Sequence, residues 1–552
     1  MERPAENSKP KFPHWYSPET GICSSLHSSR TLPDDPFLDA VSFIFSRKHD
    51  GVTAFIDSSS GSSISYLKLI PLVKSVASGL HNEGIRQGDV VLLLLPNSIF
   101  FPLVFLGVLY LGAVVSTMYP LCSAQEIKKR IVDCKARIAF TVSENFTKLQ
   151  SLGIPFIGVP ENGNLNVKTD GFETFNMLLN DFTDLALRPV IRQQDTAAIM
   201  YSSGTTGASK GVVITHGNFI SMVELFVRFE ASQYQYPSAK NVYLAVLPMF
   251  HIYGLSLFVM GLLSLGSSIV VMRKFGIEET VKVIDEYKIT HFPVVPPILT
   301  ALTRKAKDVC GNSLKTLKQV SCGAAPLSGK AIEHFLESFP DVDLIQGYGM
   351  TESTAVGTRG FNTKTFRKHS SLGLLAPNTE AKIMDCVTGS FLPPGRLGEL
   401  YIRGSGVMKG YFNDVKATAL AIDREGWLHT GDICYVDNDG YFYIVDRSKE
   451  IIKCKGFQIA PADLEAVLSS HPEIFDVAVT AAADEEYDEI PVAFVVKRHE
   501  SKLTEEEVID YVTKQVAPYK KVRKVVFTTS IPRSAAGKIL RRELRNSLTS
   551  RL

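Results

Sequence analysis

Short apolar runs recur along the first two thirds of this sequence, and several end in a turn that contains glycine or proline. Runs with no polar face are typical of strands that are buried on both sides in a parallel sheet. Helical patterns such as 100–111 stand between them, so the alternation predicts a parallel sheet with helices on both faces. Ligands bind at the carboxyl ends of such strands, where we expect the site. The expected strands cover residues 90–95, 113–117, 138–141, 197–201, 242–247, 269–272, 289–295, 318–322 and 343–345.

More than one domain is expected, because 552 residues exceed what one ordinary hydrophobic core organises. Beyond about residue 375 the pattern changes to short alternating runs between glycine and proline turns, which is typical of a twisted antiparallel unit. We therefore expect an α/β fold with a large N-terminal domain (1–445), made of parallel α/β subdomains plus a twisted antiparallel β subdomain. A charged hinge (446–449) and a small mobile α+β domain (450–552) are expected to follow.

The smaller domain has helix and strand signals of its own. Helices are expected over 461–469 and from a capping box at Thr504 to about residue 516, and strands over 476–481, 491–497 and 522–527. Three other stretches have weaker patterns. We expect little regular structure over 1–36, mainly helix over 36–84, and an irregular excursion over 155–190.

Composition excludes several classes of protein. The chain has 59 basic and 57 acidic residues, so it has no broad electrostatic field for nucleic acid. Two long uncharged stretches, 90–125 and 241–272, are broken by proline and polar residues, and we interpret them as buried strand–helix units rather than membrane spans. The N-terminus has no apolar signal core, so secretion is not expected. Eight cysteines without a C-x-x-C pair predict neither a zinc site nor a disulfide framework.

One loop, YSSGTTGASKG at 201–211, combines glycines with four hydroxyl side chains and a lysine. Glycines allow close approach of the backbone to a ligand, and the hydroxyls and Lys210 add donors and a positive charge, so the loop is expected to wrap phosphate oxygens. It differs from a Walker A loop, because Ser209 precedes the lysine and Gly211 follows it. The sequence therefore predicts a phosphate site of another kind.

Taken with four further segments, this loop resembles the adenylate-forming enzymes, which include acyl-CoA synthetases, adenylation domains and luciferases. The further segments are QGYGMTES at 346–353, HTGD at 429–432, VDRSKEIIKCKGFQIAPADLE at 445–465 and PRSAAGKILRR at 532–542. PMFHIYG at 248–254 is similar to the plant 4-coumarate–CoA ligase and ligase-like branch. The resemblance implies two steps: a carboxylate attacks the α-phosphate of ATP to give acyl-AMP, and the thiol of CoA then displaces AMP.

The resemblance also implies roles for particular residues, with ATP, CoA and Mg²⁺ as the ligands. Lys538 is expected to act in the first step, Lys453 in the second, and His251 to gate the acyl pocket or steady the reacting groups. Glu352 is expected to hold Mg²⁺. The implied ATP- and AMP-binding residues are Ser202, Ser203, Gly204, Thr205, Thr206, Lys210, Gln346, Gly347, Tyr348, Thr351, Asp432, Arg447, Lys449, Lys453, Gln458 and Lys538. Lys274, Lys455 and Gly456 are the implied CoA-binding residues.

An acyl pocket is expected around Tyr253, Leu257, Gly323, Ala324, Gly347, Ala355 and Val356. Three positions depart from true 4-coumarate ligases. Leu257 replaces a small polar residue, Ala355 replaces a proline, and Arg359 stands where the family is usually apolar. The favoured substrate is 4-coumarate or a related hydroxycinnamate, and the alternative is a fatty or oxylipin acid. A luciferase-like oxygenase, a peptide-synthetase adenylation domain and a non-catalytic binding protein are less favoured.

The chain ends in Ser550-Arg551-Leu552, a conservative variant of the Ser-Lys-Leu peroxisomal address. We therefore expect recognition by the peroxisomal import receptor and a peroxisomal location, with the cytoplasm as the alternative. No partnership with nucleic acid and no integral membrane span are expected.

Overall fold

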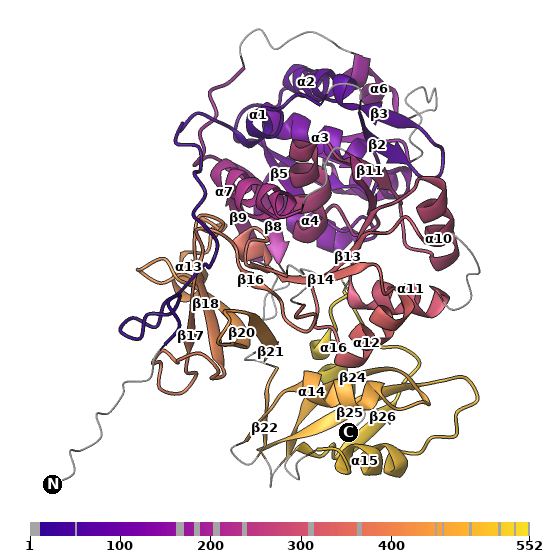
Figure 1. Ribbon diagram of the computed structural model, residues 1–552. Helices are drawn as coiled ribbons and strands as arrows, with labels where there is room; N and C mark the ends of the chain where they lie inside the picture. Colours follow the sequence, from indigo (N-terminus) through magenta and orange to yellow (C-terminus); the bar gives the residue numbers. More distant parts are fainter. Residues whose placement is uncertain are drawn as a thin grey trace, which may run out of the picture.

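The computed structural model describes residues 12–49, 52–161, 171–180, 188–202, 210–234, 240–306, 314–360, 367–447, 450–454, 457–484, 488–516, 520–534 and 537–549. It shows a mixed α/β fold in which a small C-terminal domain lies against one end of a large N-terminal body (Figure 1). The predicted fold class is confirmed.

One sheet of the large body has the strand order β19-β9-β8-β5-β4-β6-β7. Its inner strands run parallel, whereas β9 and β19 add antiparallel pairing at one edge. All of β4 is buried, as its uncharged sequence predicts. The strands are β4 (Val90–Leu94), β5 (Val114–Thr117), β6 (Ala136–Thr141), β7 (Phe156–Gly158), β8 (Thr196–Ser202), β9 (Lys210–Thr215) and β19 (Gly410–Tyr411).

A second sheet has the order β16-β15-β14-β13-β12-β10-β11-β2-β3. It is parallel from β14 to β2 and antiparallel at both edges. The strands are β2 (Thr53–Asp57), β3 (Ser63–Ser65), β10 (Val242–Ala245), β11 (Ser268–Val271), β12 (His291–Val294), β13 (Gln319–Cys322), β14 (Asp343–Tyr348), β15 (Thr358–Arg359) and β16 (Leu374–Leu375).

Helices cover these sheets, and one apolar cluster of buried side chains joins both sheets to them. The helix α3 is the most buried, because its sequence FFPLVFLGVLY is apolar on every side. No helix in the described part of the chain is long and apolar enough to cross a membrane. The helices are α1 (Ala40–Ile44), α2 (Tyr66–Asn82), α3 (Phe100–Tyr110), α4 (Ala124–Cys134), α5 (Phe146–Leu152), α6 (Glu173–Asn180), α7 (His216–Met222), α8 (Phe229–Ser232), α9 (Ile252–Gly254), α10 (Ile277–Glu286), α11 (Pro296–Ala306), α12 (Gly329–Ser338) and α13 (Val415–Ala421).

Short helical turns of other kinds complete the body. Two are π-helical, η2 (Val223–Arg228) and η4 (Leu255–Gly261), and they continue α7 and α9. Such turns are rare and often lie at functional sites. The others are the 3₁₀ turns η1 (Ser143–Asn145), η5 (Leu262–Leu265) and η6 (Thr351–Ser353).

An antiparallel sheet forms the predicted third unit of the large body, in the order β1-β17-β18-β20-β21, with its own apolar cluster. Its strands are β1 (Cys23–Ser24), β17 (Glu380–Met384), β18 (Gly398–Arg403), β20 (Leu428–Val436) and β21 (Phe442–Arg447). Because β21 continues to Arg447, the first two residues of the predicted hinge belong to a strand. Ser448 and Lys449 lie outside the described residues.

The C-terminal domain packs helices on a mixed sheet, with apolar clusters separate from those of the large body (Figure 1). The predicted capping box is confirmed: the Glu507 N–H donates to Thr504 Oγ1 (3.3 Å) and the Thr504 N–H to Glu507 Oε2 (2.9 Å). The elements are β22 (Ile452–Cys454), β23 (Phe457–Ile459), α14 (Pro461–Ser469), β24 (Ile474–Asp484), β25 (Asp488–Lys497), α15 (Glu505–Thr513), β26 (Lys524–Phe527) and α16 (Arg541–Thr549).

Of three local predictions, the irregular excursion over 155–190 is wrong. Mainly helix over 36–84 and little regular structure in the described part of 1–36 are confirmed apart from short strands. The stretch 36–84 contains β2 and β3 besides its helices, because β2 completes the parallel sheet next to β11. The stretch 155–190 contains β7 and α6. Residues 23–24 form a strand against β17. β1 and β2 pair with β17 and β11, which are distant in sequence, so no local pattern indicates these pairings.

Candidate active site

The phosphate loop joins two strands whose ends are held side by side. The last residue of β8, Ser202, pairs with the first of β9, Lys210, in antiparallel register. The loop between them is therefore anchored at both ends at an edge where parallel strands finish. Ser203, Gly204, Thr205 and Thr206 lie outside the described residues.

Glu352 joins this loop to the turn after β14. Its carboxylate is buried, and Oε1 accepts a hydrogen bond from Ser202 Oγ (2.8 Å) and another from the Tyr411 hydroxyl (3.1 Å). The Lys210 ammonium lies 4.9 Å from the centre of the Tyr411 ring. Four side chains from β8, β9, β19 and η6 thus meet at one point, where a cation and hydroxyls stand beside one carboxylate. Tyr411 was not predicted, because no motif marks it.

Tyr348 and Asp432 form a second polar contact close to the end of β14. The Tyr348 hydroxyl donates to Asp432 Oδ2 at 2.6 Å, and Thr430 Oγ1 accepts from the Asp432 N–H at 3.1 Å. Burial and the negative charge of Asp432 hold the pKa of Tyr348 above its ordinary value. The structure therefore brings these two predicted nucleotide-binding residues together. Arg447 pairs with Asp432 through the β20–β21 ladder, and its side chain lies outside the described residues.

Other predicted nucleotide residues are held by the same turn. Gln346 donates through Nε2 to the carbonyl of His369 at 2.6 Å, so its amide is fixed rather than free to swing. Thr351 is buried at the start of η6.

The predicted acyl-pocket residues converge beside β13 and β14. A Cβ placed on Gly323 would lie 3.4 Å from both the Gly347 carbonyl oxygen and the Tyr253 ring, so a side chain there would fill the gap between them. The Tyr253 hydroxyl donates to the carbonyl of Ser321 at 3.4 Å. Leu257 lies in η4 and is buried.

The loop after β14 has an unusual backbone. Thr354 and Ala355 adopt φ of 51° and 62°, and Ala324 adopts 68°, all in the left-handed region that costs energy for residues with a Cβ. Proline, which is fixed near −65°, cannot take the place of Ala355 on this path. Val356 is buried and lies against Gly406.

Arg359, the third departure noted in the sequence, is also placed at this pocket. It lies opposite Gly347 in the β14–β15 pair, and its guanidinium Nη1 would be 3.2 Å from a Cβ on Gly347. Its partner is Glu230, at the end of the helical segment that contains η2: Nη2 donates to Oε1 at 3.0 Å, and Nε lies 2.8 Å from Oε2. Glu230 was not predicted.

His251 and Lys538 are near enough to interact electrostatically although they come from different domains. Burial, with a smaller contribution from the positive charge of Lys538, lowers the pKa of His251 to about 4. The turn that carries Lys538 is closed by a hydrogen bond from the Gly537 N–H to the Ser534 carbonyl (2.8 Å), and Gly537 approaches Val295 of the large body. A neutral imidazole and a lysine therefore stand together at the carboxyl edge of the sheets.

Two buried side chains that sequence reasoning missed hold the backbone beside His251. Thr117 Oγ1 donates to the Phe250 carbonyl at 2.6 Å, and Asn97 Oδ1 accepts from the Met249 N–H at 2.8 Å. Thr117 ends the buried strand β5 and Asn97 follows the buried strand β4, and that is the signal that could have found them.

The remaining predicted residues are placed only in part. Lys455 and Gly456 lie outside the described residues, as do the side chains of Lys453 and Gln458, whose backbones pair across β22 and β23. In Figure 1, β22 lies at the left of the C-terminal domain, below β21. Lys274 lines a surface cavity of about 500 Å³ next to Arg273, which pairs with Glu144.

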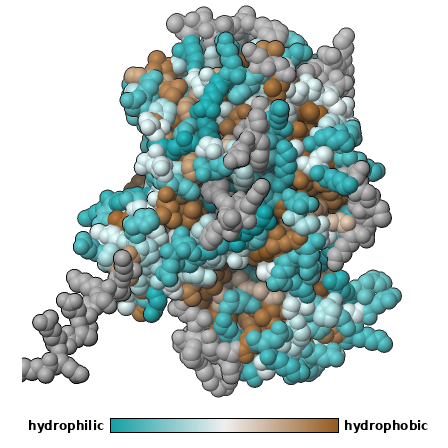
Figure 2. All heavy atoms as spheres, viewed as in Figure 1, coloured by the Kyte–Doolittle hydropathy of each residue, from teal (hydrophilic) through white to brown (hydrophobic). Residues whose placement is uncertain are grey.

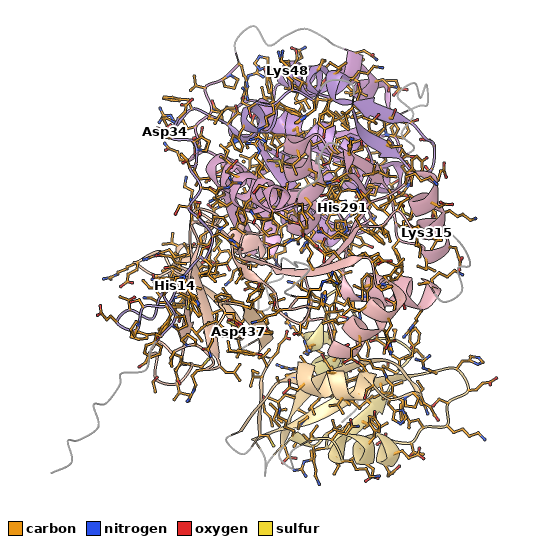
Figure 3. All side chains as sticks on the ribbon, in the orientation of Figure 1. His14, Asp34, Lys48, His291, Lys315 and Asp437 are labelled. Atoms are coloured by element: carbon orange, nitrogen blue, oxygen red, sulfur yellow. The ribbon has the colours of Figure 1, made fainter. Side chains whose placement is uncertain are left out.

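Acid should destabilise the fold through His291, which lies inside the large body (Figure 3). Burial, helped by the charges of Lys318 and Arg359, lowers its pKa from 6.5 to about 3. The unfolded chain therefore binds a proton that the folded chain does not, and stability present above pH 6.5 is lost as the pH falls towards 3. We expect His291→Phe, which keeps a ring against Tyr243, to flatten the fall in melting temperature between pH 6.5 and 4. The matched control His499→Phe, at an exposed histidine, should leave it unchanged. The prediction would be contradicted if the melting temperature fell equally with pH in the native protein and in both variants.

Comparison with known proteins agrees with the geometry. Residues 44–412 match the family model of the AMP-binding enzymes, and 463–538 match the AMP-binding enzyme C-terminal domain. The chain is 61% identical over 545 residues to 4-coumarate–CoA ligase-like 6 of Arabidopsis thaliana, covering 98% of this chain and 96% of that one. It is 43% identical over 540 residues to peroxisomal OPC-8:0-CoA ligase 1 of Arabidopsis thaliana, covering 96% and 98%.

Solved structures show the same fold. The anthranilate CoA ligase AuaEII in complex with anthranoyl-AMP superposes with a TM-score of 0.80 at 23% identity, covering 94% of this chain and 99% of that one. The sequence similarity spans nearly the whole chain, and the family model matches well over half of it. The chain therefore belongs to the AMP-binding enzymes, in their plant 4-coumarate–CoA ligase-like branch, and is an AMP-forming acid–CoA ligase.

Proposed function

We propose that the acid activated by this ligase is 4-coumarate or a related hydroxycinnamate. The observation that carries the proposal is a group of polar side chains behind the predicted acyl pocket. They line one part of a cavity of about 20 Å³, which has room for about one water molecule and whose other walls are apolar. The group includes Arg359, Glu230 and Asn241. An apolar chain that reached this end would cover polar atoms without replacing their hydrogen bonds, which is costly. A flat ring with a hydroxyl suits a short pocket with a polar end.

In this proposal the two-step chemistry uses groups already described. Attack of a carboxylate on a phosphate brings two anions together, so catalysis needs cations and oriented donors rather than a covalent nucleophile. Lys538 would supply the cation in the first step. The neutral His251 beside it would accept a hydrogen bond or move aside without adding charge. Asp432, held by Tyr348, would accept from the ribose hydroxyls.

The second candidate, a fatty or oxylipin acid, is supported by the similarity to the OPC-8:0-CoA ligase. Pyrophosphate release and thioester formation should be measured with 4-coumarate, cinnamate, caproate and a jasmonate precursor. We expect 4-coumarate to have the highest kcat/KM. The proposal fails if no hydroxycinnamate is turned over while one of the aliphatic acids is. A thioester detected by mass spectrometry would also exclude a luciferase-like oxygenation as the main reaction.

We also propose that Glu352 binds Mg²⁺ together with the phosphates of ATP. The fit is reasonable: its carboxylate is buried beside the phosphate loop, and both described hydrogen bonds go to Oε1. The described residues include no cluster of three or more metal-ligating side chains. A single carboxylate plus substrate phosphates is the usual way in which Mg²⁺ is held.

Glu352→Gln is expected to raise the Mg²⁺ concentration needed for half-maximal pyrophosphate release by about 10- to 100-fold. The amide keeps an oxygen that accepts from Ser202 but loses the charge that attracts the cation. Glu333→Gln, at an exposed glutamate of α12, is the control. An unchanged Mg²⁺ dependence in Glu352→Gln would assign the metal to other groups.

A peroxisomal location is proposed on the basis of Ser550-Arg551-Leu552, which lie outside the described residues, and of the peroxisomal relative. An N-terminal fluorescent fusion is expected to collect in peroxisomes and to become cytosolic when these three residues are removed. A fusion that is cytosolic in both forms would contradict the proposal.

A further inference from the structure

The Arg359–Glu230 ion pair lies in the interior beside the acyl pocket and not on the surface. Side-chain exposure is 6% for Arg359 and 13% for Glu230. The face of the molecule in Figure 2 is a mixture of hydrophilic residues and separate hydrophobic patches. Ion pairs on a protein surface are common and contribute little to stability. A buried pair is different, because desolvation offsets most of its attraction and it is weak evidence for stability. Its position therefore calls for another explanation.

The pair connects the pocket wall to the small cavity behind it. Arg359 lies against Gly347 on one side. It also acts on the neighbouring Tyr253: burial raises the pKa of the Tyr253 phenol, and the positive charge of Arg359 opposes that shift. Glu230 lines the cavity together with Asn241 and Tyr234. The guanidinium rests 5.3 Å from the centre of the Phe226 ring, which limits its movement.

One buried acceptor at this cavity has no partner in the part of the chain that the structure describes. Asn241 is 4% exposed, and its side-chain oxygen Oδ1 makes no hydrogen bond there. A buried polar atom of this kind costs free energy unless something supplies a donor. The Tyr234 hydroxyl is already the acceptor of a hydrogen bond from Gln319 Nε2 at 2.7 Å.

We infer that the Arg359–Glu230 pair and Asn241 form a polarity filter at the far end of the acyl pocket, which selects acids with a hydroxyl group at that end. The inference rests on the proposed function and adds the residues that read the substrate. A hydroxyl donates to Asn241 Oδ1 or to the Glu230 carboxylate and accepts from Arg359. An apolar end leaves Asn241 Oδ1 without a donor. A carboxylate end competes with Glu230, because Arg359 is already neutralised.

The first test compares two acids that differ by one hydroxyl. We expect the native enzyme to favour 4-coumarate over cinnamate in kcat/KM, and the double variant Arg359→Met with Glu230→Leu to lower this ratio by at least about tenfold. The ratio is insensitive to a general loss of active enzyme. The control is Arg403→Met with Glu380→Leu, a more exposed pair in the antiparallel sheet, for which the ratio should not change. Asn241→Leu should also lower the ratio of kcat/KM for 4-coumarate to kcat/KM for cinnamate.

The second test exchanges the charge. Glu230→Gln leaves Arg359 without its anion, so an acid with a distal carboxylate, such as 4-carboxycinnamate, should gain at least about tenfold in kcat/KM relative to cinnamate. The filter is refuted if the double variant keeps the native ratio and Glu230→Gln gains nothing with 4-carboxycinnamate. If neither cinnamate is a substrate, the proposed function fails separately. The same comparison is then made with 12-hydroxydodecanoate and dodecanoate, where an unchanged ratio in the double variant refutes the filter.

Discussion

Replacing Lys538 by alanine is expected to slow acyl-AMP formation by about 100- to 1,000-fold, the usual cost of removing one aligned charge or donor from a transition state. The reason is the position of this lysine: it comes from the C-terminal domain but acts on His251 of the large body. We propose that its charge acts on the carboxylate and the α-phosphate in the first step. ATP–pyrophosphate exchange in the presence of 4-coumarate measures this step alone.

The second half-reaction separates a catalytic role from a structural one. With synthetic acyl-AMP and CoA, Lys538→Ala should make thioester at close to the native rate, whereas Lys453→Ala should show the reverse pattern. Lys524→Ala, at an exposed lysine of β26, should leave both steps unchanged. If Lys538→Ala retained native exchange, the assignment of the first-step cation would be wrong.

Opposite effects of Lys538→Ala and Lys453→Ala on the two half-reactions would also support a movement at the proposed hinge. β22, which carries Lys453, lies at the left of the C-terminal domain in Figure 1, whereas the Lys538 turn meets the large body. The two lysines thus come from different parts of this domain. We therefore propose that the domain rotates about residues 446–449 between steps. A disulfide or crosslink that fixes the present orientation should allow acyl-AMP formation and block thioester formation. Unimpaired thioester formation after crosslinking would exclude the rotation.

Much of the fold could be predicted because its signals are local. The β4 sequence is uncharged over its whole length, which only a buried parallel strand explains well, and α14 begins with Pro461 and matches its predicted bounds. The site could be located for a related reason: the motifs that begin at Tyr201 and Gln346 start in the last residues of strands, and parallel strands bring their carboxyl ends to one edge.

Other residues of the site could not be predicted, because their roles depend on contacts with residues far away in the sequence. Tyr411 resembles any tyrosine in a short strand, yet it donates to Glu352 beside the phosphate loop. Glu230 belongs to an ordinary helical pattern, where an acidic residue indicates a solvated face. Only the tertiary fold places it against Arg359. The sequence marked Arg359 as a departure from its family but carried no information about its partner.

Breaking the Arg359–Glu230 pair is expected to have a large effect on stability. Glu230→Leu should destabilise the protein by about 3–5 kcal/mol, because it leaves the buried Arg359 charge without its anion. Adding Arg359→Met should restore most of this loss, because two apolar side chains of similar volume replace a pair whose desolvation cost is high. The melting temperature is measured for the native protein, the single variants Glu230→Leu and Arg359→Met, and the double variant. We expect the single variants to melt lowest and the double variant to melt close to the native protein.

The partly exposed pair Arg403–Glu380 is again the control, and its single variants should change the melting temperature less, since ion pairs in contact with water contribute at most about 1 kcal/mol. If Glu230→Leu melted at the native temperature, Arg359 would have to find another anion or reach solvent, and the filter would lose its physical basis. If the double variant melted as low as the single variants, the pair would be required for the fold itself. A stable double variant with an altered substrate ratio would instead show that the chain keeps a buried ion pair for selectivity, at little benefit to stability.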